Sequence, residues 1–158
     1  MKLKSFKLLG LVGMSIFLMG CSSNSSIVSL HDAAWNGNVD EIQKQLKEGA
    51  DVNIKRDQTT LGHIAALKKN KGMMKLLIAN GLDLNATDKN GAMPLHVAVP
   101  MGDMDMVELL LKEKIQLNHQ IEFGKYKGKT ALNMAYDFKQ NEIAEMLKEN
   151  GAKKGEEL

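Results

Sequence analysis

The chain is short of the residues from which most catalytic and metal sites are built. Its 158 residues include one cysteine, two prolines and four histidines. One cysteine cannot close an intramolecular disulfide, and no Cys/His spacing typical of zinc ligands is present. We find neither a glycine-rich phosphate loop after residue 20 nor a serine, cysteine or lysine in a recognisable nucleophile setting. These absences predict a protein that is not an enzyme and that holds no cofactor and no metal.

The first 20 residues have the pattern of an export signal. Three lysines, at positions 2, 4 and 7, precede the mostly apolar residues 8–19. That run is shorter than the ~20 residues that a membrane-spanning helix needs, and it fits the hydrophobic region of a signal peptide. Removing residues 1–20 takes away three of the 21 basic residues and none of the 19 acidic ones, so the remaining net charge is near −1. We therefore expect no nucleic-acid partner.

The four residues Leu18-Met19-Gly20-Cys21 resemble the lipobox of bacterial lipoproteins. This resemblance implies cleavage before Cys21, lipid on its thiol, and stable anchoring through several acyl chains. The serine-rich residues 21–26 would then be a flexible tether. Ser22 favours the periplasmic face of the outer membrane if the source is Gram-negative. The alternatives are an incidental cysteine in an uncleaved start-transfer helix, or a secreted protein cut elsewhere.

A unit of 32–33 residues recurs along the rest of the chain. Its copies read "LHDAAWNGNVDEIQKQLKEGADVN", "GHIAALKKNKGMMKLLIANGLDLN" and "LHVAVPMGDMDMVELLLKEKIQLN". A fourth copy, residues 127–152, carries Asn133 at the position of the histidine, 37 residues after the third one. Such a period indicates a repeat architecture. The recurring residues are His31, His63 and His96, and Asn53, Asn85 and Asn118.

These segments closely resemble the ankyrin repeat, whose pattern includes T-P-L-H-x-A-A and G-A-D-V-N. The resemblance implies an all-α ankyrin-repeat solenoid of about four helix-turn-helix units with β-hairpin-like connecting loops, and a function in binding another protein. The second helix of each unit has a leucine-rich face that only stacking can bury. Lys69 departs from the pattern, because it replaces the glycine between two helices. The expected units are 27–56, 57–88, 89–121 and 122–152, followed by a charged tail, 153–158.

The repeated histidines raise the question of a metal site. Stacking would place them in a row roughly 10 Å apart, the thickness of a packed layer. That separation is too large for shared ligation at about 2 Å per bond. In ankyrin repeats this histidine bonds to the backbone of the neighbouring turn, and we expect His119, in a hairpin, to be solvated. The resemblance thus assigns structural roles to His31, His63, His96, Thr60, Pro94 and Thr130.

The positions on which the repeat pattern is silent are the candidates for partner binding. In ankyrin arrays the two residues after the Ala-Ala pair face the concave groove, which implies a stripe of large apolar residues here. A lone tryptophan in such a stripe is typical of an interaction hot spot. Packing against the adjacent hairpin is the alternative. The long insert 118–130, with Lys125 between two aromatic residues, is a second candidate surface. The predicted partner-binding residues are Trp35, Asn36, Leu67, Lys68, Met101, Phe138, Phe123 and Tyr126.

Together these patterns predict a monomeric, lipid-anchored lipoprotein of the bacterial envelope that binds a partner protein. Ankyrin lipoproteins that resemble it suggest an immunity protein against a secreted antibacterial toxin, or a helper of an envelope enzyme. A periplasmic metal or heme carrier, with His96, Met101 and Met104 as ligands, stays open. So does a host-directed effector, although an anchor at Cys21 argues against injection.

Overall fold

The computed structural model describes residues 29–113 and 115–158, so the predicted signal, Cys21 and the tether lie outside the described residues. Within this part the chain forms eight α-helices, one two-stranded antiparallel sheet and two short 3₁₀ helices. The elements are α1 (Leu30–Trp35), α2 (Val39–Lys47), β1 (Lys55–Arg56), β2 (Thr59–Thr60), α3 (Leu61–Leu67), α4 (Lys71–Ala79), α5 (Pro94–Ala98), α6 (Met104–Leu111), η1 (Gly124–Tyr126), α7 (Ala131–Asp137), α8 (Asn141–Glu149) and η2 (Gly155–Glu157).

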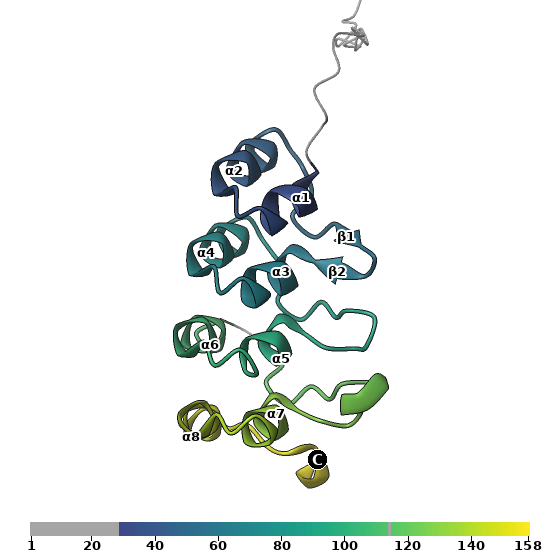
Figure 1. Ribbon diagram of the computed structural model, residues 1–158, viewed down its shortest axis with the longest axis vertical. Coiled ribbons are helices and arrows are strands. Elements are labelled where there is room, and N and C mark those ends of the chain that lie inside the picture. The colour runs from purple at the N-terminus through teal and green to yellow at the C-terminus, as the bar shows by residue number, and fades with distance from the viewer. Residues whose placement is uncertain (1–28, 114) are drawn as a thin grey trace, which may run out of the picture.

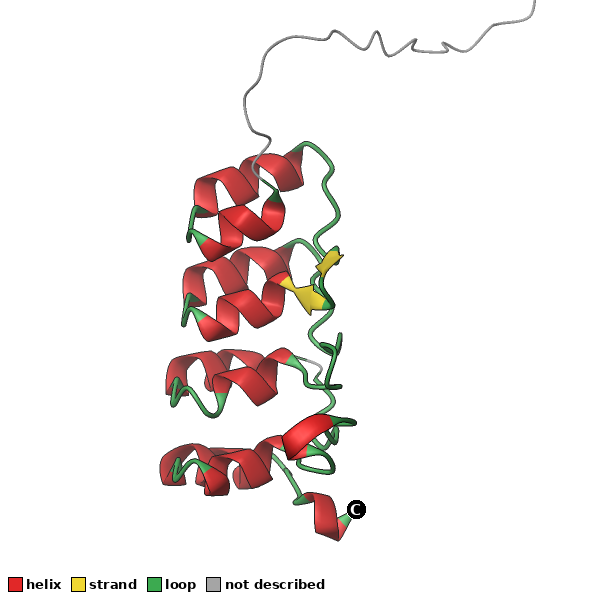
Figure 2. Ribbon diagram, turned by 45° about the vertical axis from the view of Figure 1, so that its right-hand side comes forward, coloured by secondary structure: helices red, strands yellow, loops and turns green. Residues whose placement is uncertain are grey.

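The helices form four antiparallel pairs that stack in chain order, as Figure 1 shows. The inner helices α1, α3, α5 and α7 pack on one another in sequence, and the outer helices α2, α4, α6 and α8 do the same. The connecting loops project together to one side of the stack (Figure 2). The predicted all-α solenoid of four helix-turn-helix units is therefore confirmed.

Side-chain caps set where the inner helices begin. The hydroxyls of Thr60 and Thr130 accept backbone N–H bonds from the residues three positions on, each at 3.4 Å, at the starts of α3 and α7. Such bonds satisfy donors that the first helical turn leaves free. Pro94 occupies the first position of α5, where its missing N–H costs nothing. Thr60, Pro94 and Thr130 thus lie at helix starts.

The turn between the helices of each pair needs a residue with left-handed backbone. Gly37 and Gly102 supply it in the first and third units, with φ of 70° and 66°. Lys69 and Lys139 stand there in the second and fourth units, with φ of 52° and 56°. A residue with a β-carbon is strained in this region, whereas glycine is not. The Lys69 departure seen in the sequence is therefore a site of backbone strain.

The core lies between the inner and outer rows of helices. Alanines of the inner helices, such as Ala65 and Ala66 in α3, are fully buried and let the outer helices approach closely. Met73, Met74 and Leu77 of α4 are fully buried against them. No single pair could cover these side chains, so stacking of the units buries them. Among the described residues, no helix has the length and apolar character needed to cross a membrane.

Candidate partner-binding groove

Each hairpin is tied to the inner helix of the preceding unit by a histidine. Nε2 of His31 lies 2.9 Å from the carbonyl oxygen of Thr59, and Nε2 of His63 lies 2.8 Å from that of Ala92. Because a carbonyl oxygen can only accept, Nε2 carries the proton in both rings. These residues occupy the register that the sequence spacing marked, and each holds the hairpin at a fixed distance from its helix.

His96 is fixed at both ring nitrogens. Its Nε2 donates to the carbonyl oxygen of His119 at 3.1 Å, and its Nδ1 accepts the backbone N–H of Met93 at 3.2 Å. Burial lowers the pKa of His96 to about 4, since the charged ring would be desolvated. With both nitrogens engaged and the side chain 2% exposed, His96 is a poor ligand for the metal or heme carrier that stayed open above.

His119 differs from its expected solvated state. Its Nε2 donates to the carbonyl oxygen of Gly91 at 2.8 Å, and its ring meets that of His96 edge-on with centroids 5.9 Å apart. The side chain is half-buried. The expectation was wrong because the neighbouring hairpin lies within reach, which a position in a loop does not reveal.

The recurring asparagines form a second row of bonds between units. Nδ2 of Asn53 donates to the carbonyl oxygen of Gly81 at 3.0 Å, while its Oδ1 accepts the N–H of Asp83 at 2.7 Å. Oδ1 of Asn118 likewise accepts the N–H of Lys153 at 2.7 Å. Their spacing is visible in the sequence, but the sequence alone indicated no role for them. The constant interval was the signal, because an amide that repeats in register can pair with the same backbone site each time.

Three hollows lie along the inner helices and the hairpins, and because neighbouring hollows share lining residues we call them together the inner groove. The first, of about 320 Å³, lies beside Arg56 and Asp57, and it shares Trp35 and Thr59 with the second, of about 220 Å³. The second shares Asp88 with the third, of about 510 Å³. The second hollow is also lined by Ile64, Leu67 and Val97, and the third is also lined by Lys89, Ile121, Phe123, Lys125, Tyr126 and Met134.

Trp35 and Leu67 come together in the second hollow. Both are large apolar side chains left exposed, by 44% and 42%. Nζ of Lys68 lies 5.0 Å from the centre of the Trp35 ring, in the range of a cation–π contact. The floor of this hollow includes Ile64 and Val97, so it offers an apolar site with a positive charge at its edge.

The insert 118–130 folds against the hairpin before it. The backbone N–H groups of Glu122 and Phe123 both donate to the carbonyl oxygen of Asn90, at 3.0 and 2.9 Å. Phe123 is 59% exposed, whereas Tyr126 is half-buried. Phe123 and Tyr126 both line the third hollow. The insert therefore forms the wall of the groove over the last two units.

The other predicted partner-binding residues lie apart from these hollows. Phe138 is 39% exposed and its ring lies 6.0 Å from that of Tyr126, centroid to centroid. Met101 is half-buried on the turn between α5 and α6, and Asn36 is exposed just after α1. Tyr136, which sequence analysis did not select, is 41% exposed under Nζ of Lys154 at 5.0 Å. The structure thus pairs Phe138 with Tyr126, whereas Trp35 shares its hollow with Leu67, and a single binding stripe through these residues stays a prediction.

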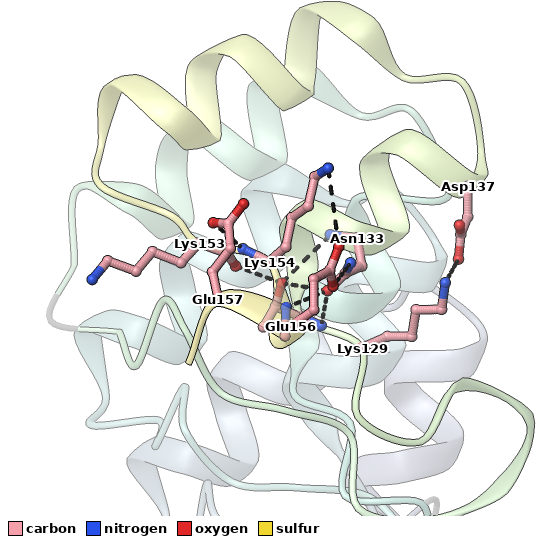
Figure 3. A network of polar contacts seen from close by, with 9 residues as sticks. Lys129, Asn133, Asp137, Lys153, Lys154, Glu156 and Glu157 are labelled. Atoms are coloured by element: carbon pink, nitrogen blue, oxygen red, sulfur yellow. Dashed lines mark hydrogen bonds and ion pairs between the residues drawn. The ribbon is translucent and has the colours of Figure 1, made fainter.

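Residues 153–158, expected as a charged tail, fold onto the fourth unit (Figure 3). Asn133 donates through Nδ2 to Oε2 of Glu156 at 3.0 Å and accepts the N–H of Gly155 at 2.7 Å. The hydroxyl of Thr130 donates to the carbonyl oxygen of Lys153 at 2.7 Å. The bond from Asn133 lowers the pKa of Glu156. The tail therefore takes the place that the next hairpin has in the other units.

The side chains that could ligate a metal do not gather into a group in the described part of the chain. Across residues 29–113 and 115–158, no group of three or more His, Cys, Asp or Glu side chains is arranged to hold an ion. The described residues also leave no buried side-chain nitrogen or oxygen without a hydrogen-bond partner. The buried polar side chains of the described residues are thus already committed to the fold, and exposed side chains remain available for binding.

Comparison with known proteins gives a family match along nearly the whole described chain. The family described as "Ankyrin repeats (3 copies)" matches residues 30–121 and 63–157. Delta-latroinsectotoxin-Lt1a of Latrodectus tredecimguttatus is 34% identical over 96 residues, which is 56% of this chain and 8% of that protein. NF-kappa-B inhibitor cactus of Drosophila melanogaster is 31% identical over 105 residues, 65% of this chain and 21% of its own. Mitochondrial disaggregase of Bos taurus is 32% identical over 115 residues, 72% of this chain and 17% of its own. The chain spans less than a quarter of the length of these relatives.

Proposed function

Since this chain belongs to the ankyrin-repeat family, whose repeats mediate protein–protein interaction, we propose that it is a binding module that holds a partner protein in the inner groove. One relative is named an inhibitor of another factor, NF-kappa-B, which fits a function exerted by binding. The observation that carries the proposal is the pairing of Trp35 and Leu67, two exposed apolar side chains in one hollow. Exposed aromatic anchors of this kind dominate binding energy in protein interfaces.

The binding mechanism is recognition by a rigid surface. The histidine and asparagine bonds fix hairpins and helices relative to one another, so little conformational entropy is lost when a partner docks. Trp35 and Phe123 provide apolar contact area, and Lys68 adds a positive charge beside Trp35. No chemical step is part of this function.

The test is capture of a partner by residues 22–158, which include the whole described fold. The bait is incubated with solubilised envelopes and culture supernatant, and bound proteins are identified by mass spectrometry. Trp35→Ala is expected to weaken capture by on the order of 1–4 kcal/mol while leaving the unfolding midpoint nearly unchanged. Ile54→Ala is the matched control, because Ile54 is equally exposed, at 47%, and lines none of the three hollows. Equal capture by both variants and the parent would refute the groove.

The proposal extends to the place where binding occurs. We place the module on a bacterial envelope membrane through lipid on Cys21, on the strength of the lipobox pattern in the sequence. A tethered binder meets its partners at raised effective concentration. The Cys21→Ala variant is expected to leave the washed membrane fraction and to lose labelling by radioactive fatty acid. Unchanged membrane retention of that variant would remove the lipid anchor from the proposal.

The captured protein distinguishes the two partner classes that the lipoprotein resemblance suggests. A secreted toxin, recovered in equal amount with the bait, identifies an immunity protein. An envelope enzyme whose activity changes on binding identifies a helper. The same purified bait also tests the carrier alternative, through its absorbance spectrum and metal content.

A further inference from the structure

Lysines that form no ion pair with another described residue border the second and third hollows of the inner groove, and we infer that this part of the groove receives an acidic, extended segment of the partner that also presents an apolar side chain. The inference rests on the proposed function, because it names the partner chemistry of the same groove.

The acidic residues of the inner helices are already paired. In the part of the chain that the structure describes, these helices contain two acidic residues, Asp32 in α1 and Asp137 in α7. Oδ1 of Asp32 lies 2.8 Å from Nη1 of Arg56, and Oδ2 of Asp137 lies 2.8 Å from Nζ of Lys129. The hydroxyl of Ser29 and then Arg56 lower the pKa of Asp32, so it stays ionised at neutral pH. The helical side of the groove therefore offers no free carboxylate.

Several cations remain unpaired on the hairpins and turns. Lys68, Lys89, Lys125 and Lys127 are exposed, and none forms an ion pair with another described residue. Lys68 lies over the ring of Trp35. Lys125 lies over the ring of Tyr126, with Nζ 5.2 Å from the centre of that ring. Positive charge and apolar surface are therefore adjacent in both the second and the third hollow.

The acidic residue between these hollows does not cancel that charge. Oδ1 of Asp88 accepts the backbone N–H groups of Asn90 and Ala92, at 2.8 and 2.9 Å, within its own hairpin. Among the described residues that line the third hollow, Asp88 is the one acidic residue, whereas Lys89 and Lys125 are both basic. Apart from Arg56 and Lys129, which pair with the carboxylates of the inner helices, the hairpin segments 53–60, 85–93 and 118–130 contain Lys55, Lys89, Lys125 and Lys127 against Asp57, Asp88 and Glu122.

The opposite side of the stack has the reverse balance. The outer helices contain more acidic than basic residues, so an anionic segment is attracted to the groove and repelled from the back. Charge of this kind guides encounter and selects the partner more than it adds affinity, while the apolar contacts hold the complex. The residues concerned are Asp40, Glu41, Asp105, Glu108, Glu142, Glu145 and Glu149 against Lys44, Lys47, Lys71, Lys75 and Lys148.

The test selects a ligand without naming one beforehand. A displayed library of random twelve-residue peptides, each about 40 Å long when extended, is panned on residues 22–158. The recovered peptides are expected to flank an aromatic or leucine residue with Asp and Glu. Binding of the best synthetic peptide is followed by the fluorescence of Trp35, the one tryptophan of the chain. Raising the salt concentration is expected to weaken binding of the peptide, since salt screens exposed charges.

Two double variants test whether the lysines of the groove, and not those of the outer helices, attract the peptide. Lys89→Gln with Lys125→Gln is expected to weaken the peptide by about tenfold or more. Lys47→Gln with Lys75→Gln, on the outer helices, removes the same charge and is expected to change binding less than about twofold. Equal losses from both pairs would overturn the inference, as would recovery of neutral or basic peptides.

The remaining outcomes separate this inference from the proposed function. A single-stranded oligonucleotide that binds more tightly than the best peptide would overturn the choice of a protein segment. Capture of a partner that depends on Trp35 but shows no preference for acidic residues would overturn only the inference. If neither protein nor peptide is captured through Trp35, the proposed function falls as well.

Discussion

Nε2 of His63 donates a hydrogen bond of 2.8 Å to the carbonyl oxygen of Ala92, although 29 residues separate them in the chain. Nδ1 of the same ring lies 2.7 Å from the hydroxyl of Thr60, the residue that caps α3. One imidazole thus joins the start of its own helix to the hairpin of the next unit. Burial lowers the pKa of His63, because the charged ring would be desolvated, and it does so although the bond to Ala92 acts in the opposite direction.

The buried histidines predict a pH-dependent stability. His96 has a pKa of about 4 in the fold and 6.5 when unfolded, so the unfolded chain binds the extra proton between those values. The contribution of neutral His96 to the free energy of unfolding is therefore fully present above pH 6.5. It is lost as the pH drops toward 4, and the loss is on the order of 3 kcal/mol. Urea unfolding at pH 7.5, 6 and 5 measures it. His96→Asn should flatten the slope, and an equal slope in both proteins would contradict the assignment.

Replacing Lys69 by glycine is expected to stabilise the protein. The φ of 52° at Lys69 strains a residue with a β-carbon, and glycine relieves that strain by about 0.5–1 kcal/mol after its own entropy cost. Lys75→Gly is the matched control, because Lys75 lies inside α4 and the same change there should cost about 1 kcal/mol. Thermal unfolding of both variants measures the difference, and shifts of the same sign would contradict the strain.

Detaching the C-terminal tail is expected to destabilise the fourth unit. A β-carbon on Gly155 would collide with the carbonyl oxygen of Gly128, so Gly155→Ala should release the bonds to Asn133 and Thr130. The expected loss is about 1–2 kcal/mol, since buried polar groups lose partners. Deleting residues 153–158 should cost a similar amount. If the variant and the deletion are both as stable as the parent, the tail does not cap the stack.

The asparagine row is expected to contribute to coupling between units. Asn53→Ala removes bonds to Gly81 and Asp83 and should cost about 1–2 kcal/mol. Asn36→Ala is the control, because Asn36 is exposed and its side chain makes no hydrogen bond with another described residue. Denaturant unfolding compares the two. A loss at Asn36 as large as at Asn53 would contradict a specific role for the row.

Much of the fold could be predicted from the sequence because it repeats. The intervals of 32 and 33 between the histidines define one unit, and a unit with a leucine-rich face must stack to bury it. The groove was harder to predict, because its residues need not repeat. Pro100 stands just after α5, which ends at Ala98. Pro100 lies four residues after His96, as Trp35 lies four residues after His31, so the third unit has a proline at the register of Trp35 and Met101 takes the turn position of Asn36.

The sequence by itself determined the number of units, the helix pairs and the register of the histidines and asparagines, since these depend on local pattern and period. Only the tertiary structure decided which side chains meet across units. It brought Trp35 to Leu67 and Tyr126 to Phe138, and it folded residues 153–158 against Asn133. Such contacts depend on how separate units lie against one another in space, and the local sequence around each residue does not determine that arrangement.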